Sequence, residues 1–178
     1  MAEESALKSG ATAEYSVALL KFLGDREPLD VFAQTAADLR AAVKGLSKRQ
    51  LDTPEAPGRW SVAAVVKHLA DVEVVLGFRY RKVLGEPGTR IPAIDQDAWA
   101  DRLEYLTADV PSALDDFEAL RGVNLRLLRA VKNGQWELFG IHEQRGNETL
   151  RHMVRLYAAH DCYHLHQIDR IKKAIGAS

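Results

Sequence analysis

Four long stretches of this chain place apolar residues at intervals of three and four, the period of an α-helix that buries one face. The pattern predicts helices over residues 30–46, 61–84, 112–132 and 149–175, with a shorter helix over residues 12–23 before them. No stretch alternates apolar and polar residues as a half-buried strand does, so no strand is expected. The pattern therefore favours an all-α fold, a four-helix bundle.

The segments between the expected helices are uneven in length. Residues of N-cap type stand where the four main helices should begin: Asp30, Ser61, Ser112, and either Glu148 or Thr149. Two connections, residues 85–110 and 136–147, contain prolines or glycines and are longer than a bundle needs. Loops of this length often build or cover functional sites.

Length and composition indicate one domain over residues 1–178, with residues 1–11 flexible. The formal net charge of −1 gives no basic excess for nucleic acid or an anionic membrane. Glu3 and Glu4 stand where a signal peptide would be basic and then apolar, and no apolar run approaches membrane-spanning length, so we expect a cytoplasmic protein. Cys162 is the only cysteine, which excludes an intrachain disulfide and a cysteine-rich zinc site.

The strongest chemical signal is a pair of histidines in the last helix. At ~100° per residue His160 and His164 lie ~40° apart on one face, within the apolar stripe. Two buried imidazoles need a shared partner, which a metal ion would supply. Satisfaction by water or backbone is about equally common for such a pair. Asp161 replaces the glutamate of the zinc-peptidase pattern H-E-x-x-H, so we reject a peptidase.

Other residues in the same region are weaker candidates. His166 and Cys162 lie ~200° from the two histidines and are expected outside the site. His68, on the flank of the second main helix, is the natural third ligand, although a lone histidine at the edge of a core is usually structural. Three histidines would leave a coordination position open for water or substrate. Asp71 is expected either to orient His68 or to be merely solvated.

At this point the chain resembles the DinB/YfiT-like family of helical-bundle metalloproteins over nearly its whole length. Three motifs are similar to the family's signatures: PGRWSV at 57–62 followed by KHLADVE at 67–73, IDQDAWA at 94–100, and HDCYHLHQI at 160–168. The resemblance implies that His68, His160 and His164 bind the metal. Lys67 departs from the glutamate that family members commonly carry before the first histidine, at a position outside the ligand set. The family resemblance further implies an up-down-down-up four-helix bundle that is usually a homodimer and binds zinc or nickel.

Characterised relatives include transferases and isomerases that use low-molecular-weight thiols such as bacillithiol, mycothiol or glutathione. The leading hypothesis is therefore a metal-dependent thiol S-transferase that acts on a small molecule. A hydrolase that uses metal-activated water fits the same ligands, and so does a non-catalytic bundle with a structural metal.

Several residues are further candidates for roles around the metal. Asp71 and Glu73 are candidate general bases, and Arg79 and Asp97 are expected to line the opening of the site. His142 and Asp97 are the candidates for a fourth protein ligand.

Overall fold

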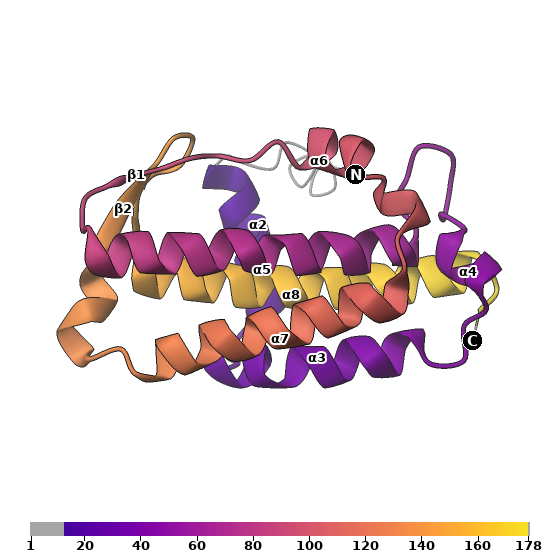
Figure 1. The fold of residues 1–178 in the computed structure, drawn as a ribbon, viewed down its shortest axis with the longest axis horizontal. Helices are drawn as coiled ribbons and strands as arrows, with labels where there is room; N and C mark the ends of the chain where they lie inside the picture. Colours follow the sequence, from indigo (N-terminus) through magenta and orange to yellow (C-terminus); the bar gives the residue numbers. More distant parts are fainter. Residues whose placement is uncertain (1–12, 178) are drawn as a thin grey trace.

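Four long helices form the body of the protein. The computed structural model describes residues 13–177, so the expected flexible segment 1–11 lies outside them. The helices are α3 (Pro28–Val43), α5 (Val62–Gly85), α7 (Val110–Arg129) and α8 (Leu150–Ala174). Figure 1 shows that α3 and α8 run one way and α5 and α7 the other. This is the up-down-down-up four-helix bundle predicted from the sequence.

Smaller elements surround the bundle. They are α2 (Ala13–Leu23), α4 (Lys48–Asp52), α6 (Gln96–Arg102), and two 3-10 helices, η1 (Tyr105–Thr107) and η2 (Asn133–Glu137). Helix α2 packs across α8 and buries Tyr15, Leu19 and Leu23 in the core. Helix α6 was not expected, because its seven residues lie in a segment whose prolines and polar residues indicate a loop.

Two of the expected helix starts are confirmed and two are wrong. The hydroxyls of Ser61 and Thr149 accept backbone N–H groups of the first turn, as N-caps do. Helix α3 begins at Pro28 rather than after Asp30, and α7 begins at Val110 after the N-cap Asp109 rather than after Ser112. Each of these two helices has a proline in its first turn, where the missing N–H costs no helical hydrogen bond.

The expectation of no strands is also wrong. Strands β1 (Arg90–Ile91), β2 (Phe139–His142) and β3 (Gly146–Thr149) form a small sheet of order β1-β2-β3, parallel between the first two and antiparallel between the last two. They are too short for a period of two to stand out. In β2 the apolar side chains also face solvent, while Gly140 and His142 are buried.

A polar layer divides the core of the bundle into two apolar halves. One half gathers Phe32 with the ends of α5 and α7 and the start of α8, and the other gathers Leu39 with the opposite ends of these helices. Between them are buried His68, Glu73, Arg121, His160, Asp161 and His164. Burying so many polar groups requires that each has a partner.

Arg121 supplies the partner for two buried carboxylates. Its Nη1 donates to Asp161 Oδ2 of α8 at 2.6 Å and its Nη2 to Glu73 Oε1 of α5 at 2.8 Å. The guanidinium also lies 4.2 Å from the ring centre of Phe32 on α3. Asn124, one turn further along α7, donates to Glu73 Oε2 at 3.0 Å. One arginine thus contacts all three other helices of the bundle.

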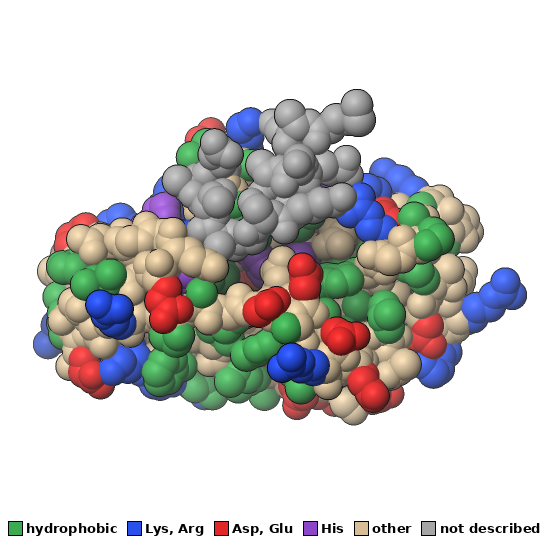
Figure 2. Space-filling model, turned by 90° about the horizontal axis from the view of Figure 1, so that it is seen from above, with side chains coloured by type: hydrophobic (Ala, Val, Ile, Leu, Met, Phe, Trp, Pro, Cys, Tyr) green, Lys and Arg blue, Asp and Glu red, His purple; other side chains and the backbone are tan. Residues whose placement is uncertain are grey.

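The surface carries exposed apolar side chains along one edge, which Figure 2 shows as a run of green between charged groups. Val74 and Phe78 on α5 and Val123 on α7 are among the exposed apolar residues of the protein. No helix within residues 13–177 is long and apolar enough to cross a membrane.

Removing the Arg121 charge should destabilise the fold strongly. We expect Arg121→Met to lower the free energy of unfolding by ~3–5 kcal/mol, because two carboxylates would remain buried without a cation. The control is Arg40→Met, which breaks an exposed pair with Asp115 and Glu118 and should lower the free energy of unfolding far less, because water already screens these charges. Urea unfolding of both variants gives the comparison, and equal losses would contradict the prediction.

Candidate metal centre

Helices α5 and α8 bring three imidazoles together in the polar layer. The Nε2 atom of His160 lies 3.0 Å from Nε2 of His164 and 3.2 Å from Nε2 of His68. All three side chains are buried, and one nitrogen from each lies within 4.8 Å of the other two. The spacing of four residues between His160 and His164 puts both rings on the face of α8 that meets His68. The structure therefore assembles the three predicted ligands.

These separations fit nitrogens that share one ion. Two ligands bound at ~2.0–2.1 Å in tetrahedral or octahedral geometry lie about 3.0–3.4 Å apart. Hydrogen bonds alone do not explain them, because a neutral imidazole carries a single N–H. Nε2 of His160 can donate that hydrogen to only one of its two neighbours. A cation that receives all three lone pairs removes this conflict.

The surroundings hold His164 in the tautomer that a metal requires. Its Nδ1 donates to Gln167 Oε1 at 2.7 Å, so Nε2 is left with a free lone pair. Trp60 stacks on the same ring at 13° with centres 6.4 Å apart and lies 4.9 Å from the ring of His68. These contacts fix the orientations of the rings.

Burial keeps the three rings neutral. It lowers the pKa of His68 and His160 well below the ordinary value, and in each case a neighbouring histidine of the cluster lowers it further. Burial also lowers the pKa of His164, to about 4. Near neutral pH all three nitrogens can therefore bind a cation without first losing a proton.

A cavity of about 400 Å³ opens on this cluster and is lined by His68 and His160. Arg79 and Asp97, which were expected to line the opening, are both in its wall. The sequence did not indicate two further wall residues, Arg145 and Tyr157. The hairpin β2–β3 brings Arg145 to the cavity, and Tyr157 looks in the sequence like another core position of α8.

Neither candidate fourth ligand joins the cluster. His142 and Asp97 line the cavity, but within residues 13–177 only the three histidines form a metal-binding group. The Nδ1 of His142 instead accepts the backbone N–H of Gln144 at 3.2 Å. The described part of the chain therefore leaves the predicted open position free of protein ligands.

The two candidate general bases have other partners. Asp71 pairs with Lys67 at 2.8 Å, and no hydrogen bond joins it to His68 in the described part of the chain. Glu73 is bound to Arg121 and Asn124. As predicted, His166 lies outside the cluster and is exposed, and buried Cys162 is also outside it. We therefore assign neither carboxylate as a base at the cluster.

Comparisons with known proteins identify the family of this chain. The sequence profile of the DinB superfamily matches residues 32–168. The chain is 30% identical over 151 residues to YfiT of Bacillus subtilis, which is named as a candidate metal-dependent hydrolase. The aligned part spans 84% of this chain and 85% of that protein. A relative of the same description from Bacillus cereus strain B4264 is 30% identical over 155 residues, 84% of this chain and 88% of the relative.

The solved structure of Bacillus subtilis YfiT has the same fold. It superposes with a TM-score of 0.80 over 85% of this chain and 87% of that one, and is described as an unusual four-helix bundle. This chain shares that bundle and brings together three histidines that could hold a metal ion. The chain belongs to the DinB superfamily.

The hydrogen bond from His164 to Gln167 should matter for metal affinity. We expect Gln167→Met to weaken zinc binding by ~10–100-fold, because the ring loses the partner that fixes its tautomer. His166→Gln, at the exposed neighbouring position, is the control and should bind zinc as the wild type does. Competition against a chelating dye measures both, and unchanged affinity in the first variant would rule out this orienting role.

The neutral histidines should make the metal-free protein sensitive to acid. Their folded-state pKa values lie below 6.5, so the unfolded chain binds more protons between about pH 6.5 and pH 4. As the pH is lowered across this window, the free energy of unfolding should fall by up to ~1.4 kcal/mol per pH unit for each histidine. Urea unfolding at several pH values in chelator should show that the free energy of unfolding of His164→Gln depends less steeply on pH than that of the wild type. An identical pH dependence would contradict the assignment of His164 as a neutral buried ring.

Proposed function

We propose that His68, His160 and His164 hold one divalent ion, zinc or nickel, and that the protein is a metal-dependent hydrolase of small molecules. The carrying observation is the cavity that reaches two of these neutral, buried nitrogen ligands while no other described residue joins them. A metal needed only for stability would have no use for such an opening. The names of the relatives support the same reaction class.

The residues of the chain have separate roles in this proposal. The ion, when bound, supplies a Lewis acid that lowers the pKa of a coordinated water or thiol. The three histidines present neutral nitrogens, so they leave the positive charge of the site undiminished. Gln167 and Trp60 hold the rings in place. The cavity admits the substrate and limits its size to that of a small molecule.

A metal-dependent thiol S-transferase is the second candidate, and one observation favours it. Within residues 13–177 no carboxylate belongs to the metal-binding group, and Asp71 and Glu73 are held by Lys67 and Arg121. Hydrolysis usually benefits from a side chain that moves a proton to the leaving group. An activated thiolate attacks without such a base, and an external thiol would supply the sulfur that the site lacks.

The metal assignment is tested by the variant His160→Ala. We expect about one ion per chain in the wild type and almost none in the variant, because the shared central ligand is lost. The control is His166→Ala on the same helix, which should keep its metal. Elemental analysis and melting curves with and without chelator give the readout, and unchanged metal content in His160→Ala would overturn the site.

Turnover separates the reaction classes. The metal-loaded protein is offered nitrophenyl acetate in water, and chlorodinitrobenzene with bacillithiol, mycothiol or glutathione. Ester hydrolysis that His160→Ala abolishes would support the hydrolase. A rate seen only with a thiol would overturn it in favour of the transferase, and bound metal with neither rate would leave a structural metal.

A further inference from the structure

The cavity contains a buried cation that has no carboxylate partner. Arg79 on α5 is only 2% exposed. Its Nη1 donates to the Tyr157 hydroxyl at 2.6 Å and its Nη2 to the Pro92 carbonyl at 2.7 Å, both neutral groups. Its Nε is buried and has no hydrogen-bond partner, and no acidic side chain of residues 13–177 forms an ion pair with it. Among residues 13–177, Arg79 is therefore a desolvated charge without an acidic partner.

The other charges of the cavity do not neutralise Arg79. Arg145 is also in the wall, but Glu148 already pairs with it through both carboxylate oxygens, at 2.5 and 2.9 Å. Asp95 and Asp97 line the cavity as exposed side chains, and Asp95 caps α6 by accepting the N–H of Ala98. Arg79 is therefore the buried charge of the described cavity wall that no carboxylate pairs with.

The pKa of His142 responds to its burial and to the positive charges of Arg145 and Arg79. Its pKa is lowered to about 4, mainly by burial and then by Arg145 and Arg79, while Glu148 and Glu143 oppose this shift. It stands in the wall as a neutral ring and adds no negative charge.

An unpaired buried guanidinium is costly, and natural structures rarely keep one without use. Arginine presents a planar fork of N–H groups that matches a carboxylate with two parallel hydrogen bonds. Tyr157 adds a hydroxyl beside this fork. The geometry points to Arg79, with Tyr157, as the subsite that binds a carboxylate of the substrate. The inference rests on the proposed function only for the position of the reacting group.

Tyr157 also sets the distance between the subsite and the histidines. Its hydroxyl meets Arg79, while its ring packs edge-on against His160 with centres 5.7 Å apart. A substrate held at both places would have its carboxylate and its reacting centre about one tyrosine side chain apart. The substrate class is therefore a small acid whose reacting group is a few bonds from the carboxylate.

The test compares charged and neutral probes of equal size. The cobalt-loaded protein is titrated with mercaptoacetate, mercaptopropionate and mercaptobutanoate and with their three amides, following the thiolate-to-cobalt charge-transfer absorption. At the best chain length we expect the acid to bind ~10–100-fold tighter than its amide, the range of a charge-assisted hydrogen bond. Arg79→Gln should reduce that ratio to about one.

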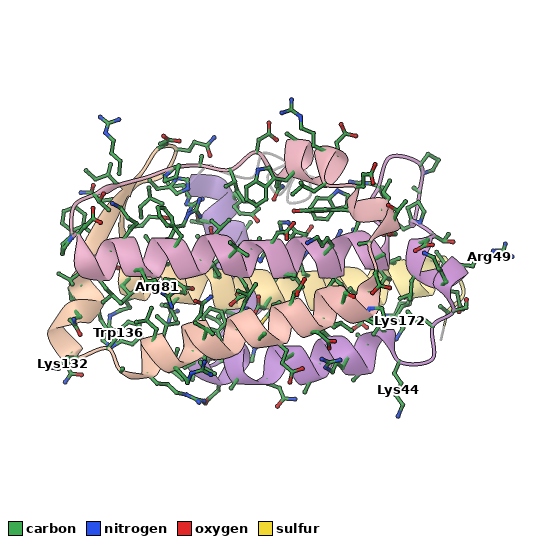
Figure 3. All side chains as sticks on the ribbon, viewed as in Figure 1. Lys44, Arg49, Arg81, Lys132, Trp136 and Lys172 are labelled. Atoms are coloured by element: carbon green, nitrogen blue, oxygen red, sulfur yellow. The ribbon has the colours of Figure 1, made fainter. Side chains whose placement is uncertain are left out.

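Two variants guard against a general loss of charge or structure. Arg81→Gln removes a charge two residues further along α5, where Figure 3 shows the side chain between α5 and α7 and where it bonds Gly77 and Asn124. It should keep the preference for the acid. Arg79→Lys keeps the charge but loses the fork, and should retain part of the preference even if Arg79→Gln folds poorly.

A second readout needs no metal-directed group. Butanoate should raise the melting temperature of the protein as purified more than butyramide does, and Arg79→Gln should abolish the difference. No preference for the acid in either readout, or a preference that survives Arg79→Gln, overturns the subsite. If no thiol binds cobalt but butanoate still stabilises through Arg79, the metal proposal fails and the subsite stands.

Discussion

The buried charge of Arg121 is the interaction on which the rest of the bundle depends. It binds Glu73 of α5 and Asp161 of α8 while lying on a ring of α3. Asp161 follows His160 directly in the sequence. Because Arg121 holds Asp161 toward α7, His160 lies ~100° away around α8 and faces His68. The rotation of α8, and with it the convergence of the imidazoles, is set by an ion pair that takes no part in the chemistry.

Helical periodicity predicted the four long helices, and a spacing of four residues predicted that His160 and His164 share a face. His68 could be chosen by resemblance, since on its own helix it is one polar residue at the edge of an apolar face. The contacts that depend on tertiary structure were not predictable. Asp71 and Glu73 looked equally available in the sequence, but the fold gives them to Lys67 and Arg121.

The errors at the helix starts and in the sheet have local causes. The starts of α3 and α7 were placed at Asp30 and Ser112 as residues of N-cap type, whereas both lie inside helices whose first turns contain a proline. The hairpin β2–β3 turns its apolar residues outward and buries a glycine and a histidine, the reverse of the usual pattern. A Cβ at Gly140 would lie 2.2 Å from Cδ1 of Ile91, so this close approach requires glycine. That hairpin carries Arg145, which is why the sequence did not indicate this residue in the cavity wall.

The two parallel middle helices have a consequence for how such proteins diverge. Because α5 and α7 point the same way, the chain between them must travel back along the whole bundle, as Figure 1 shows. This return segment buries Ile91 in one apolar half of the core and carries Asp95 and Asp97 past the cavity as exposed side chains. Its length is dictated by the helices, but the side chains at positions such as Asp95 and Asp97 are not. Ligand preference can therefore change in this segment while the bundle and its histidines remain as they are.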